Sequence, residues 1–337
     1  MTRSETRSGI NREAYLVREL FDEKKLKHVP TRNGYGEGLV EAGRIDTSVV
    51  VLCADLTEST RCLAFKEAYP NRFVQMGVSE QSMASIAAGM SLAGKTPFIA
   101  SYACFSPGRN WEQIRTTIAL QHSNVKIVGA HAGVSVGPDG ATHQMLEDIA
   151  LMRVMPNMRV IVPCDFLEAS KATLAAAKLQ GPCYLRLTRE GSPVFTTTKT
   201  PFKVGRAETY RFGDDVTIFG TGPLLYEALL AAQQLSQDQG VECRVVNMHT
   251  IKPVDVKAIV SAAKQTGAIV TVEEAQAAGG LAGVVAETLA LTTPVPIERI
   301  GVQDRFGESG QPRELQEAME LTAPFIVQAV LRVLKRK

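Results

Sequence analysis

Short apolar runs alternate with longer, helically periodic segments through the first part of the chain. The apolar runs predict buried strands at 49–53, 73–76, 97–101, 125–130, 160–163 and 183–187. Met83, Ile86, Ala87 and Met90 recur at intervals of three and four residues, which predicts a helix that buries these side chains on one face. Other apolar spacings predict helices near 15–21, up to Val40, over 111–118 and over 167–177. This alternation is typical of a parallel α/β sheet.

The pattern is interrupted over 191–205, where the chain is polar and rich in turn residues. Beyond this stretch, strands are expected at 216–219, 243–247, 268–272 and 296–300, with helices near 222–237, 254–264, 280–291 and 322–335. We therefore predict two three-layer α/β domains, over 1–190 and 206–337, joined by a linker. The second domain is expected to be smaller, with a mainly parallel sheet.

Charge and composition narrow the class of protein. The 337 residues carry a net charge of +2, which argues against a basic surface for nucleic acid or membrane. No apolar run is long enough to span a bilayer, and residues 1–7 lack the apolar core of a secretory signal. The cysteines have no Cys-x-x-Cys spacing and are expected to be reduced, buried thiols of a cytoplasmic protein: Cys53, Cys62, Cys104, Cys164, Cys183 and Cys243.

Glu80 lies in the turn between the strand at 73–76 and the helix that follows. Apolar and small residues come directly after it, so we expect its carboxylate in a low-dielectric site. One interpretation is a first-turn acid that complements the helix dipole, and spacing alone favours it. The other is a functional carboxylate.

Three more candidates follow predicted strands. Asp55 lies at the carboxyl end of a strand, the edge where ligands bind in parallel sheets, although it is equally suited to cap a helix. Tyr102 and Phe105 are either core residues or a flat surface for a heterocycle.

A glycine-rich loop over 131–144 contains His131, Asp139 and His143. Their spacing matches no zinc motif, so we expect contacts to a ligand or else a chance surface cluster. Arg189, after another strand, is either a clamp for an anion or the partner of Glu190 in an ion pair.

Two motifs of the second half are given structural interpretations. Gly220-Thr-Gly222 lacks the third glycine of a dinucleotide site. Glu273 and Glu274 are adjacent at a strand end and point in different directions, so we interpret them as capping and surface residues.

Residues 77–90 (Gly-Val-Ser-Glu-Gln-Ser-Met-Ala-Ser-Ile-Ala-Ala-Gly-Met) resemble a motif in the pyrimidine-binding domain of thiamine-diphosphate enzymes. The resemblance is closest to transketolase and 1-deoxyxylulose-5-phosphate synthase, and next to the β subunit of 2-oxo-acid dehydrogenases. It covers nearly the whole chain and implies a pyrimidine-binding domain followed by a transketolase-type C-terminal domain. In this family, the glutamate at the position of Glu80 hydrogen-bonds the cofactor's aminopyrimidine and promotes deprotonation of the thiazolium carbon.

Further positions match the cofactor site of that family. Residues 54–57, which include Asp55 and Leu56, resemble the loop whose leucine supports the bent cofactor. Tyr102 and Phe105 match the aromatic residues that pack on the aminopyrimidine.

The substrate site of the family is matched as well. His131 and the segment 139–144 resemble transketolase almost residue for residue, which implies that Asp139 and the two histidines, His131 and His143, contact sugar hydroxyls. Three residues match positions that hold the sugar phosphate: Arg32, Ser59 and Arg189.

The chain also departs from the family. Ser79 and Gln81 flank Glu80 where transketolases usually have Arg and His, and Gly108 replaces a Tyr or Arg, which leaves the substrate open. The Gly-Asp-Gly motif and following Asn that bind the diphosphate through Mg²⁺ are absent from any fitting position. We assign no metal ligand to this chain and expect thiamine diphosphate to be shared with a partner that binds Mg²⁺.

The resemblance thus implies the C-terminal subunit of a two-chain transketolase, paired with an N-terminal subunit in an α₂β₂ heterotetramer. It would transfer a two-carbon ketol unit between phosphorylated sugars, with Glu80, His131 and His143 as catalytic residues. Three alternatives stay open: a 2-oxo-acid dehydrogenase β-type subunit, a deoxyxylulose-phosphate synthase-like enzyme, or a non-catalytic scaffold. The polar segment 139–143 argues against the dehydrogenase. Against the scaffold argues the joint retention of Glu80, Phe105, His131, Asp139 and His143, because a scaffold has no need of a buried acid, which costs stability when unpaired.

Overall fold

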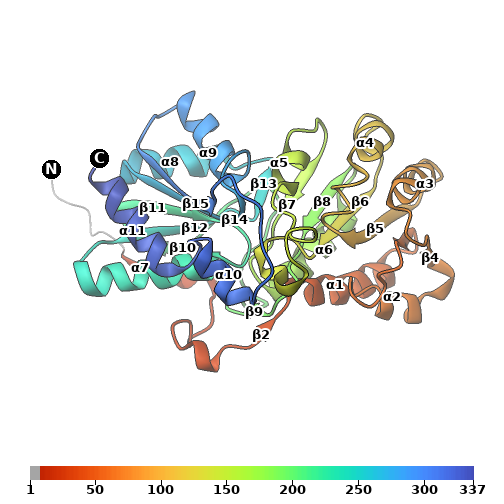
Figure 1. The fold of residues 1–337 in the computed structure, drawn as a ribbon, viewed down its shortest axis with the longest axis horizontal. Coiled ribbons are helices and arrows are strands. Elements are labelled where there is room, and N and C mark those ends of the chain that lie inside the picture. The colour runs from red at the N-terminus through yellow and green to blue at the C-terminus, as the bar shows by residue number, and fades with distance from the viewer. Residues whose placement is uncertain (1–7) are drawn as a thin grey trace.

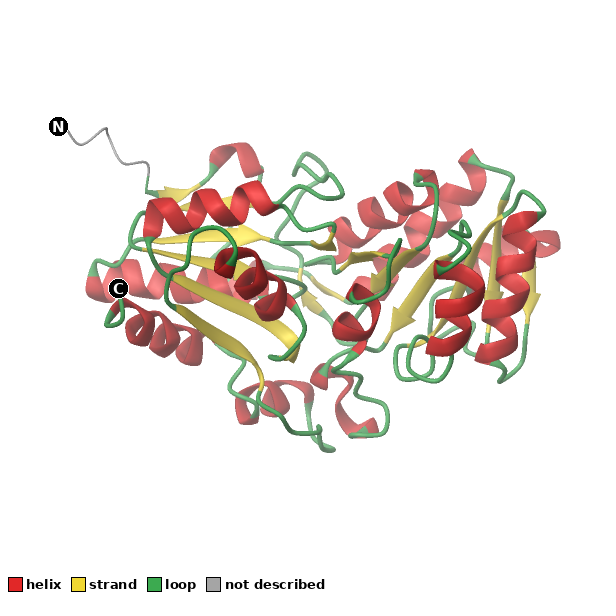
Figure 2. Ribbon diagram, turned by 90° about the horizontal axis from the view of Figure 1, so that it is seen from above, coloured by secondary structure: helices red, strands yellow, loops and turns green. Residues whose placement is uncertain are grey.

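The protein is described by a computed structural model, which covers residues 8–337. Figure 1 shows two lobes side by side. One is formed mainly from α1 (Thr31–Ile45) to β9 (Ser192–Pro193), and the other from β10 (Glu208–Phe212) to α11 (Ala323–Leu334). In each lobe helices cover both faces of a sheet (Figure 2). The prediction of two α/β units with mainly parallel sheets is confirmed.

The first sheet has seven strands, all parallel to their neighbours except the edge strand β13. In order across the sheet these are β13 (Thr250–Lys252), β7 (Arg159–Ile161), β8 (Cys183–Arg186), β6 (Lys126–Ala130), β5 (Thr96–Tyr102), β3 (Val49–Cys53) and β4 (Phe73–Gln75). The central strands are buried on both faces, which explains their unbroken apolar sequences.

The helices of the first lobe pack on these two faces. They are α1, α2 (Leu63–Ala68), α3 (Glu80–Leu92), α4 (Trp111–Gln113) with the π-helical turn Ile114–Ala119 that continues it, α5 (Asp148–Arg153) and α6 (Phe166–Lys178). Helix α1 lies very close to α6. A side chain at Gly34 would have no room, since its Cβ atom would overlap the carbonyl oxygen of Phe166. The glycines of α1 therefore serve close helix packing, which fixes Arg32 at its start.

The second sheet has a parallel centre and an antiparallel edge. Its order is β1 (Gly9–Ile10), β10, β12 (Cys243–Asn247), β11 (Val216–Gly220), β14 (Ile269–Gln276) and β15 (Ile297–Val302). Its helices are α7 (Leu225–Gln239), α8 (Val256–Thr266), α9 (Leu281–Ala290), α10 (Pro312–Ala318) and α11. A two-stranded pair, β2 (His28–Val29) with β9, lies apart from both sheets.

The two lobes exchange short strands. β1, from the start of the chain, pairs with β10, whereas β13, from the second half, pairs with β7. Apolar side chains of both halves, such as Met152 and Phe219, also belong to one buried cluster. The lobes are therefore joined by more than the segment 191–205.

Two sequence expectations are wrong. Residues 15–21 form no helix: Tyr15 has a left-handed backbone (φ 49°), and Leu16, Val17 and Leu20 pack from irregular chain against the core of the second lobe. Ile86 is 45% exposed, because α3 rests on the sheet through Met83 and Ala87 with the alanines beside them.

Some elements of the structure were not predicted from the sequence, or were predicted with the wrong bounds. The sequence pattern gave no sign of β10, β13 or α10, and β14 runs four residues beyond the predicted end of its strand.

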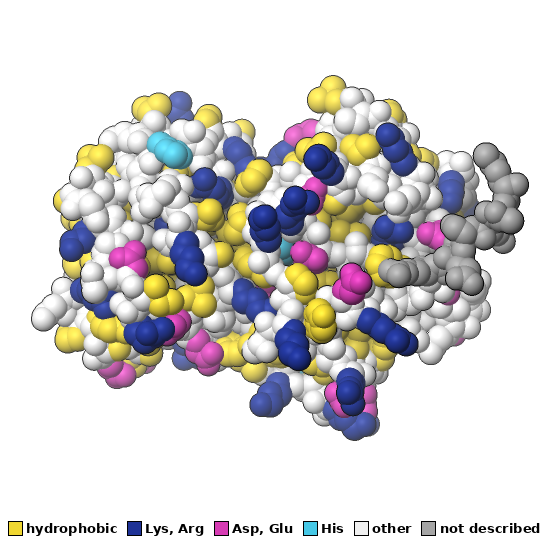
Figure 3. Space-filling model, turned by 180° about the vertical axis from the view of Figure 1, so that it is seen from behind, with side chains coloured by type: hydrophobic (Ala, Val, Ile, Leu, Met, Phe, Trp, Pro, Cys, Tyr) yellow, Lys and Arg dark blue, Asp and Glu magenta, His cyan; other side chains and the backbone are white. Residues whose placement is uncertain are grey.

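All six cysteines are free, and five are buried. No helix within residues 8–337 is both long and apolar enough to cross a bilayer. Basic and acidic side chains are interspersed over the face in Figure 3, in keeping with the balanced charge.

Candidate functional site

The loops that carry the predicted site residues leave one edge of the first sheet. Glu80 follows β4, and Asp55, Leu56 and Ser59 follow β3. Tyr102 ends β5, and Phe105 comes just after it. His131, Asp139 and His143 follow β6, and Arg189 follows β8, so all five strands are parallel members of the first sheet. Arg32 joins them from the start of α1. Parallel strands end at a common edge, so the topology itself gathers these side chains.

Glu80 is the first residue of α3 and is almost fully buried, with 1% of its surface exposed. One carboxylate oxygen accepts a hydrogen bond from Ser101 Oγ (3.2 Å), and the other accepts one from Arg109 Nη1 (2.9 Å). Asn110 donates to its backbone carbonyl oxygen (3.0 Å). The acid is paired with Arg109, so its charge is not left uncompensated in the fold.

Aromatic rings line the space beside Glu80. The rings of Tyr102 and Phe105 are nearly parallel, with their centres 6.1 Å apart. The His143 ring is nearly perpendicular to that of Phe105, with the two ring centres 5.6 Å apart. The Arg109 guanidinium lies over the Phe105 ring, 4.5 Å from its centre. The ring of His131 also stacks on Tyr102, with the two ring centres 3.8 Å apart. These rings offer flat apolar surface next to a buried carboxylate.

His131 is a neutral imidazole in a defined tautomer. Its Nε2 lies 3.1 Å from Arg32 Nη1, and since a guanidinium can only donate, Nε2 accepts and Nδ1 carries the proton. Burial, followed by the positive charges of Arg32 and Arg189, lowers the pKa of His131 to about 3. Nδ1 is buried and has no hydrogen-bond partner among residues 8–337. The ring therefore has a free N–H donor to offer a ligand.

Two buried histidines predict a loss of stability in mild acid. Burial lowers the pKa of His249 to about 3, as it does that of His131, from an ordinary value of 6.5. The unfolded chain takes up these protons below pH 6.5, whereas the folded chain does so only near pH 3. Stability is therefore complete above pH 6.5 and falls as the pH drops below it, by about 2 kcal/mol per histidine at pH 5.

Urea unfolding at pH 7.5 and pH 5.0 checks this expectation. His249→Gln should lose about 2 kcal/mol less than the wild type between the two pH values, whatever the substitution costs at both. An equal loss in the two proteins would contradict the assignment of His249 as a buried neutral group.

A cluster of arginines surrounds this part of the site. Arg32 also donates to the carbonyl oxygen of Ser59 (2.8 Å). Burial and the charges of Arg61 and Arg189 lower the pKa of Arg32, so the three guanidinium groups share one positive field. Arg61, whose Nε donates to Asn33 Oδ1 (2.8 Å), was not predicted, because the sequence does not reveal its left-handed backbone (φ 64°) or this contact.

Arg189 and Asp139 lie together at the rim. Arg189 Nη1 donates to the carbonyl oxygen of Val136 (2.7 Å) and is 3.9 Å from Asp139 Oδ1. Within residues 8–337 the acid nearest to Arg189 is Asp139, and no ion pair joins Arg189 to Glu190, so that alternative is wrong. Arg189 therefore braces the loop that carries Asp139 and His143.

The loop after β3 is braced differently. Asp55 has a left-handed backbone (φ 58°), its N–H donates to Gln75 Oε1 (3.0 Å), and it caps no helix. Leu56, next in sequence, is partly buried and accepts a hydrogen bond from Thr60 N at its carbonyl oxygen (2.9 Å).

Glu274 of the second lobe supports the glycine-rich loop from below. Its Oε1 accepts a hydrogen bond from the backbone N–H of Ser135 (2.7 Å), and a Cβ atom at Gly133 would stand 2.5 Å from that oxygen. Glu273 caps α9 by accepting from the N–H groups of Leu281 and Ala282. The capping interpretation is confirmed, but both acids are buried, so placing them on the surface is wrong.

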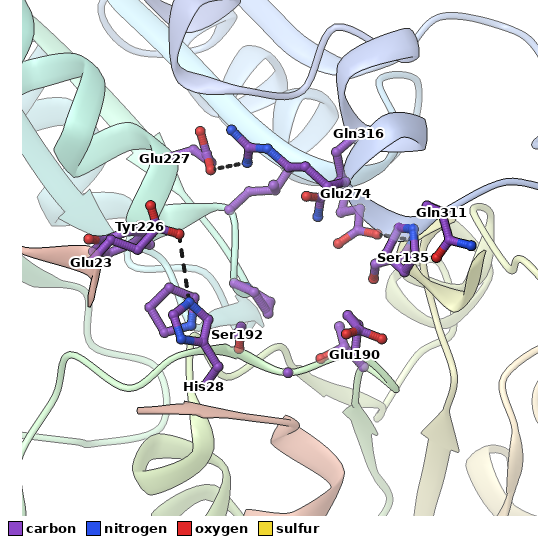
Figure 4. Close-up of a pocket in the computed structure, with 17 residues that line it drawn as sticks. Glu23, His28, Ser135, Glu190, Ser192, Tyr226, Glu227, Glu274, Gln311 and Gln316 are labelled. Atoms are coloured by element: carbon purple, nitrogen blue, oxygen red, sulfur yellow. Dashed lines mark hydrogen bonds and ion pairs between the residues drawn. The ribbon is translucent and has the colours of Figure 1, made fainter. Parts of the chain in front are cut away.

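Figure 4 shows the cavity between the lobes, of about 460 Å³, into which Glu190 and the residues of α10 project. At its edge the Glu274 carboxylate points toward the backbone N–H of Ser135. No predicted site residue lines this cavity. Of the glycine-rich loop, Ser135 lines it, so the cavity borders that loop but is separate from the candidate site.

The comparison with protein families identifies the two halves of the chain. Residues 27–193 match the transketolase pyrimidine binding domain, and residues 205–326 match the transketolase C-terminal domain. The chain belongs to the transketolase family. Members of this family depend on thiamine diphosphate, and a buried acid beside stacked aromatic rings fits an aminopyrimidine.

Its relatives include separate C-terminal chains. A putative transketolase C-terminal section of Methanocaldococcus jannaschii is 40% identical over 309 residues, which cover 91% of this chain and 96% of the relative. The 6-deoxy-6-sulfo-D-fructose transketolase subunit SqwH of Clostridium sp. (strain MSTE9) is 38% identical over 315 residues, covering 94% and 98%. A solved structure, described as a split gene transketolase, inactive beta4 tetramer, is 43% identical with a TM-score of 0.86, covering 92% and 99%. This transketolase chain therefore corresponds to the C-terminal subunit of a split transketolase.

Proposed function

We propose that this chain, with a separate N-terminal subunit, transfers a two-carbon ketol unit from a ketose to an aldose with an anionic tail. The observation that carries the proposal is the buried Glu80 carboxylate beside the Tyr102 and Phe105 rings. Thiamine diphosphate, when bound, supplies the electron sink for breaking and forming the carbon–carbon bond.

The chain's own residues would position the cofactor and move one proton. Glu80, fixed by Ser101, would hydrogen-bond the aminopyrimidine ring and hold its proton. Phe105 and Tyr102 would pack on that ring, while Leu56 would support the cofactor from the neighbouring loop, with Asp55 beside it.

The substrate would lie along the glycine-rich loop. His131 would donate from Nδ1 to an oxygen of the reacting ketose, and Asp139 and His143 would contact its hydroxyl groups. The anionic tail would lie among Arg32, Ser59, Arg189 and, as a fourth contact, Arg61. The tail would be a phosphate, or a sulfonate as in the sulfo sugar in the name of one relative.

The N-terminal subunit would bind the diphosphate through Mg²⁺ and complete the site. That a related chain forms a tetramer described as inactive supports the need for a partner. We propose an α₂β₂ heterotetramer in which two of these chains pair through their pyrimidine-binding domains. The exposed Ile86 on α3 suits such an interface.

A coupled transfer assay tests the proposal. This chain and a candidate N-terminal subunit with the Gly-Asp-Gly motif are mixed with thiamine diphosphate, Mg²⁺, a ketose phosphate and an aldose phosphate. Ketol transfer should require both chains, and an acceptor without phosphate should react roughly 10- to 100-fold less efficiently, because it lacks charge-assisted bonds to the arginines. Transfer by this chain alone, or equal efficiency with both acceptors, would contradict the proposal.

A further inference from the structure

Arg109 occupies a place that the proposed cofactor needs. Its Nη1 donates to Glu80 Oε2 at 2.9 Å, and its guanidinium lies over the Phe105 ring at 4.5 Å. The guanidinium group is planar, and here it does two things at once: it donates to the buried acid and it stacks on an aromatic face. These are the two interactions that an aminopyrimidine ring would make with the same residues.

The ring and the guanidinium cannot both fill this space, so one partner has to move. Glu80 is fixed, because Ser101 Oγ binds its second oxygen and Asn110 Nδ2 binds its backbone carbonyl. Asn110 is itself held by Ser106 Oγ (3.2 Å). The Arg109 side chain is 46% exposed and reaches solvent, so Arg109 is the group that can leave.

There is a physical reason for such an arginine. A carboxylate that is 1% exposed and unpaired costs several kcal/mol, which is more than a half-exposed ion pair contributes at a surface. Arg109 offsets part of this cost before the cofactor binds. Its departure is then part of the free energy of cofactor binding.

We propose that Arg109 is a displaceable counter-ion of Glu80: it closes the aminopyrimidine site until the cofactor takes its place. Arg109 is therefore a positioning residue that sets cofactor affinity. The inference rests on the proposed function, because it takes the ligand of Glu80 to be thiamine diphosphate.

Calorimetric titration of the two-chain complex with thiamine diphosphate and Mg²⁺ tests the inference. If the closed arrangement accounts for about nine-tenths of the molecules, Arg109→Ala should bind the cofactor roughly tenfold more tightly than the wild type. Inorganic pyrophosphate with Mg²⁺ carries no aminopyrimidine, so its affinity should be the same in both complexes. Arg109→Gln, which keeps a planar donor without the charge, should shift cofactor affinity in the same direction by less.

A matched control is Arg44→Ala, which removes an arginine paired with Glu41 at 2.6 Å on an exposed part of α1. It should leave both affinities unchanged. Weaker or unchanged cofactor binding by Arg109→Ala and Arg109→Gln would overturn the inference while the proposed function stands, since the wild type still binds. No cofactor binding by any complex, wild type included, would overturn both.

Discussion

Replacing Glu80 with alanine should reduce ketol transfer by the two-chain complex at least about 100-fold, the usual contribution of a positioned proton-transfer group. The carboxylate is the buried acid held by Ser101 beside Phe105 and Tyr102. Removing it leaves Arg109 without its partner, but that side chain is half exposed and can be solvated. The fold should therefore survive, and steady-state kinetics of the reconstituted enzyme would measure the loss.

Two further variants make this expectation specific. Glu80→Gln keeps the shape of the side chain without its proton chemistry and should be nearly as inactive as Glu80→Ala. Glu112→Ala removes an exposed acid from the adjacent α4 and should keep full activity. If Glu80→Ala retained more than a tenth of the wild-type rate, Glu80 would not be the catalytic acid. The interpretation of this chain as a non-catalytic scaffold would then be favoured.

The Arg186→Met variant is expected to lose about 3–5 kcal/mol of unfolding free energy, the range found when one partner of a buried ion pair is removed. Arg186 is 3% exposed, and its Nε donates to both oxygens of Asp148, at 3.1 and 2.8 Å. Its Nη2 donates to the carbonyl oxygens of Met145 (3.3 Å) and Glu274 (2.8 Å). One side chain thus ties the glycine-rich loop to the second lobe.

Urea unfolding of this chain measures that loss. Arg305→Met breaks an exposed pair with Glu308 and should change stability by less than about 0.5 kcal/mol. The double variant Arg186→Met with Asp148→Asn should recover part of the loss, because it no longer leaves a buried charge unpaired. A change below about 1 kcal/mol for Arg186→Met would mean that the contacts of Arg186 do not stabilise the fold as argued.

The central strands could be predicted because their own residues carry the signal, which is a run of apolar side chains. A parallel strand covered on both faces needs an unbroken apolar run, and β3 (Val-Val-Val-Leu-Cys) is such a run. The edges of the sheets are set by tertiary pairing instead. β1 and β13 have two and three residues and exist only because the other lobe offers a strand to pair with.

The helix-face prediction failed at Ile86 for a related reason. Periodicity marks which residues share a face, but the small residues Ala84 and Ala88 let α3 approach the sheet on the side away from Ile86. Near the N-terminus, Leu20 and its neighbours are apolar because they anchor irregular chain on the second lobe, which no helical period describes.

The site was predictable where residues follow strands. Glu80, His131 and Arg189 do so, and their gathering at one sheet edge follows from the topology. Arg109 and Arg61 were not predicted as site residues, because their positions depend on turns whose geometry only the fold defines. The roles of all these residues remain predictions.

The most direct test of the central claim is calorimetric binding of thiamine diphosphate with Mg²⁺, first to this chain alone and then after addition of the N-terminal subunit. The proposal places the aminopyrimidine contacts on this chain and the diphosphate contacts on the partner, so tight binding should appear only in the mixture. Tight binding to the isolated chain would contradict the shared site, because it would require a diphosphate site within this chain.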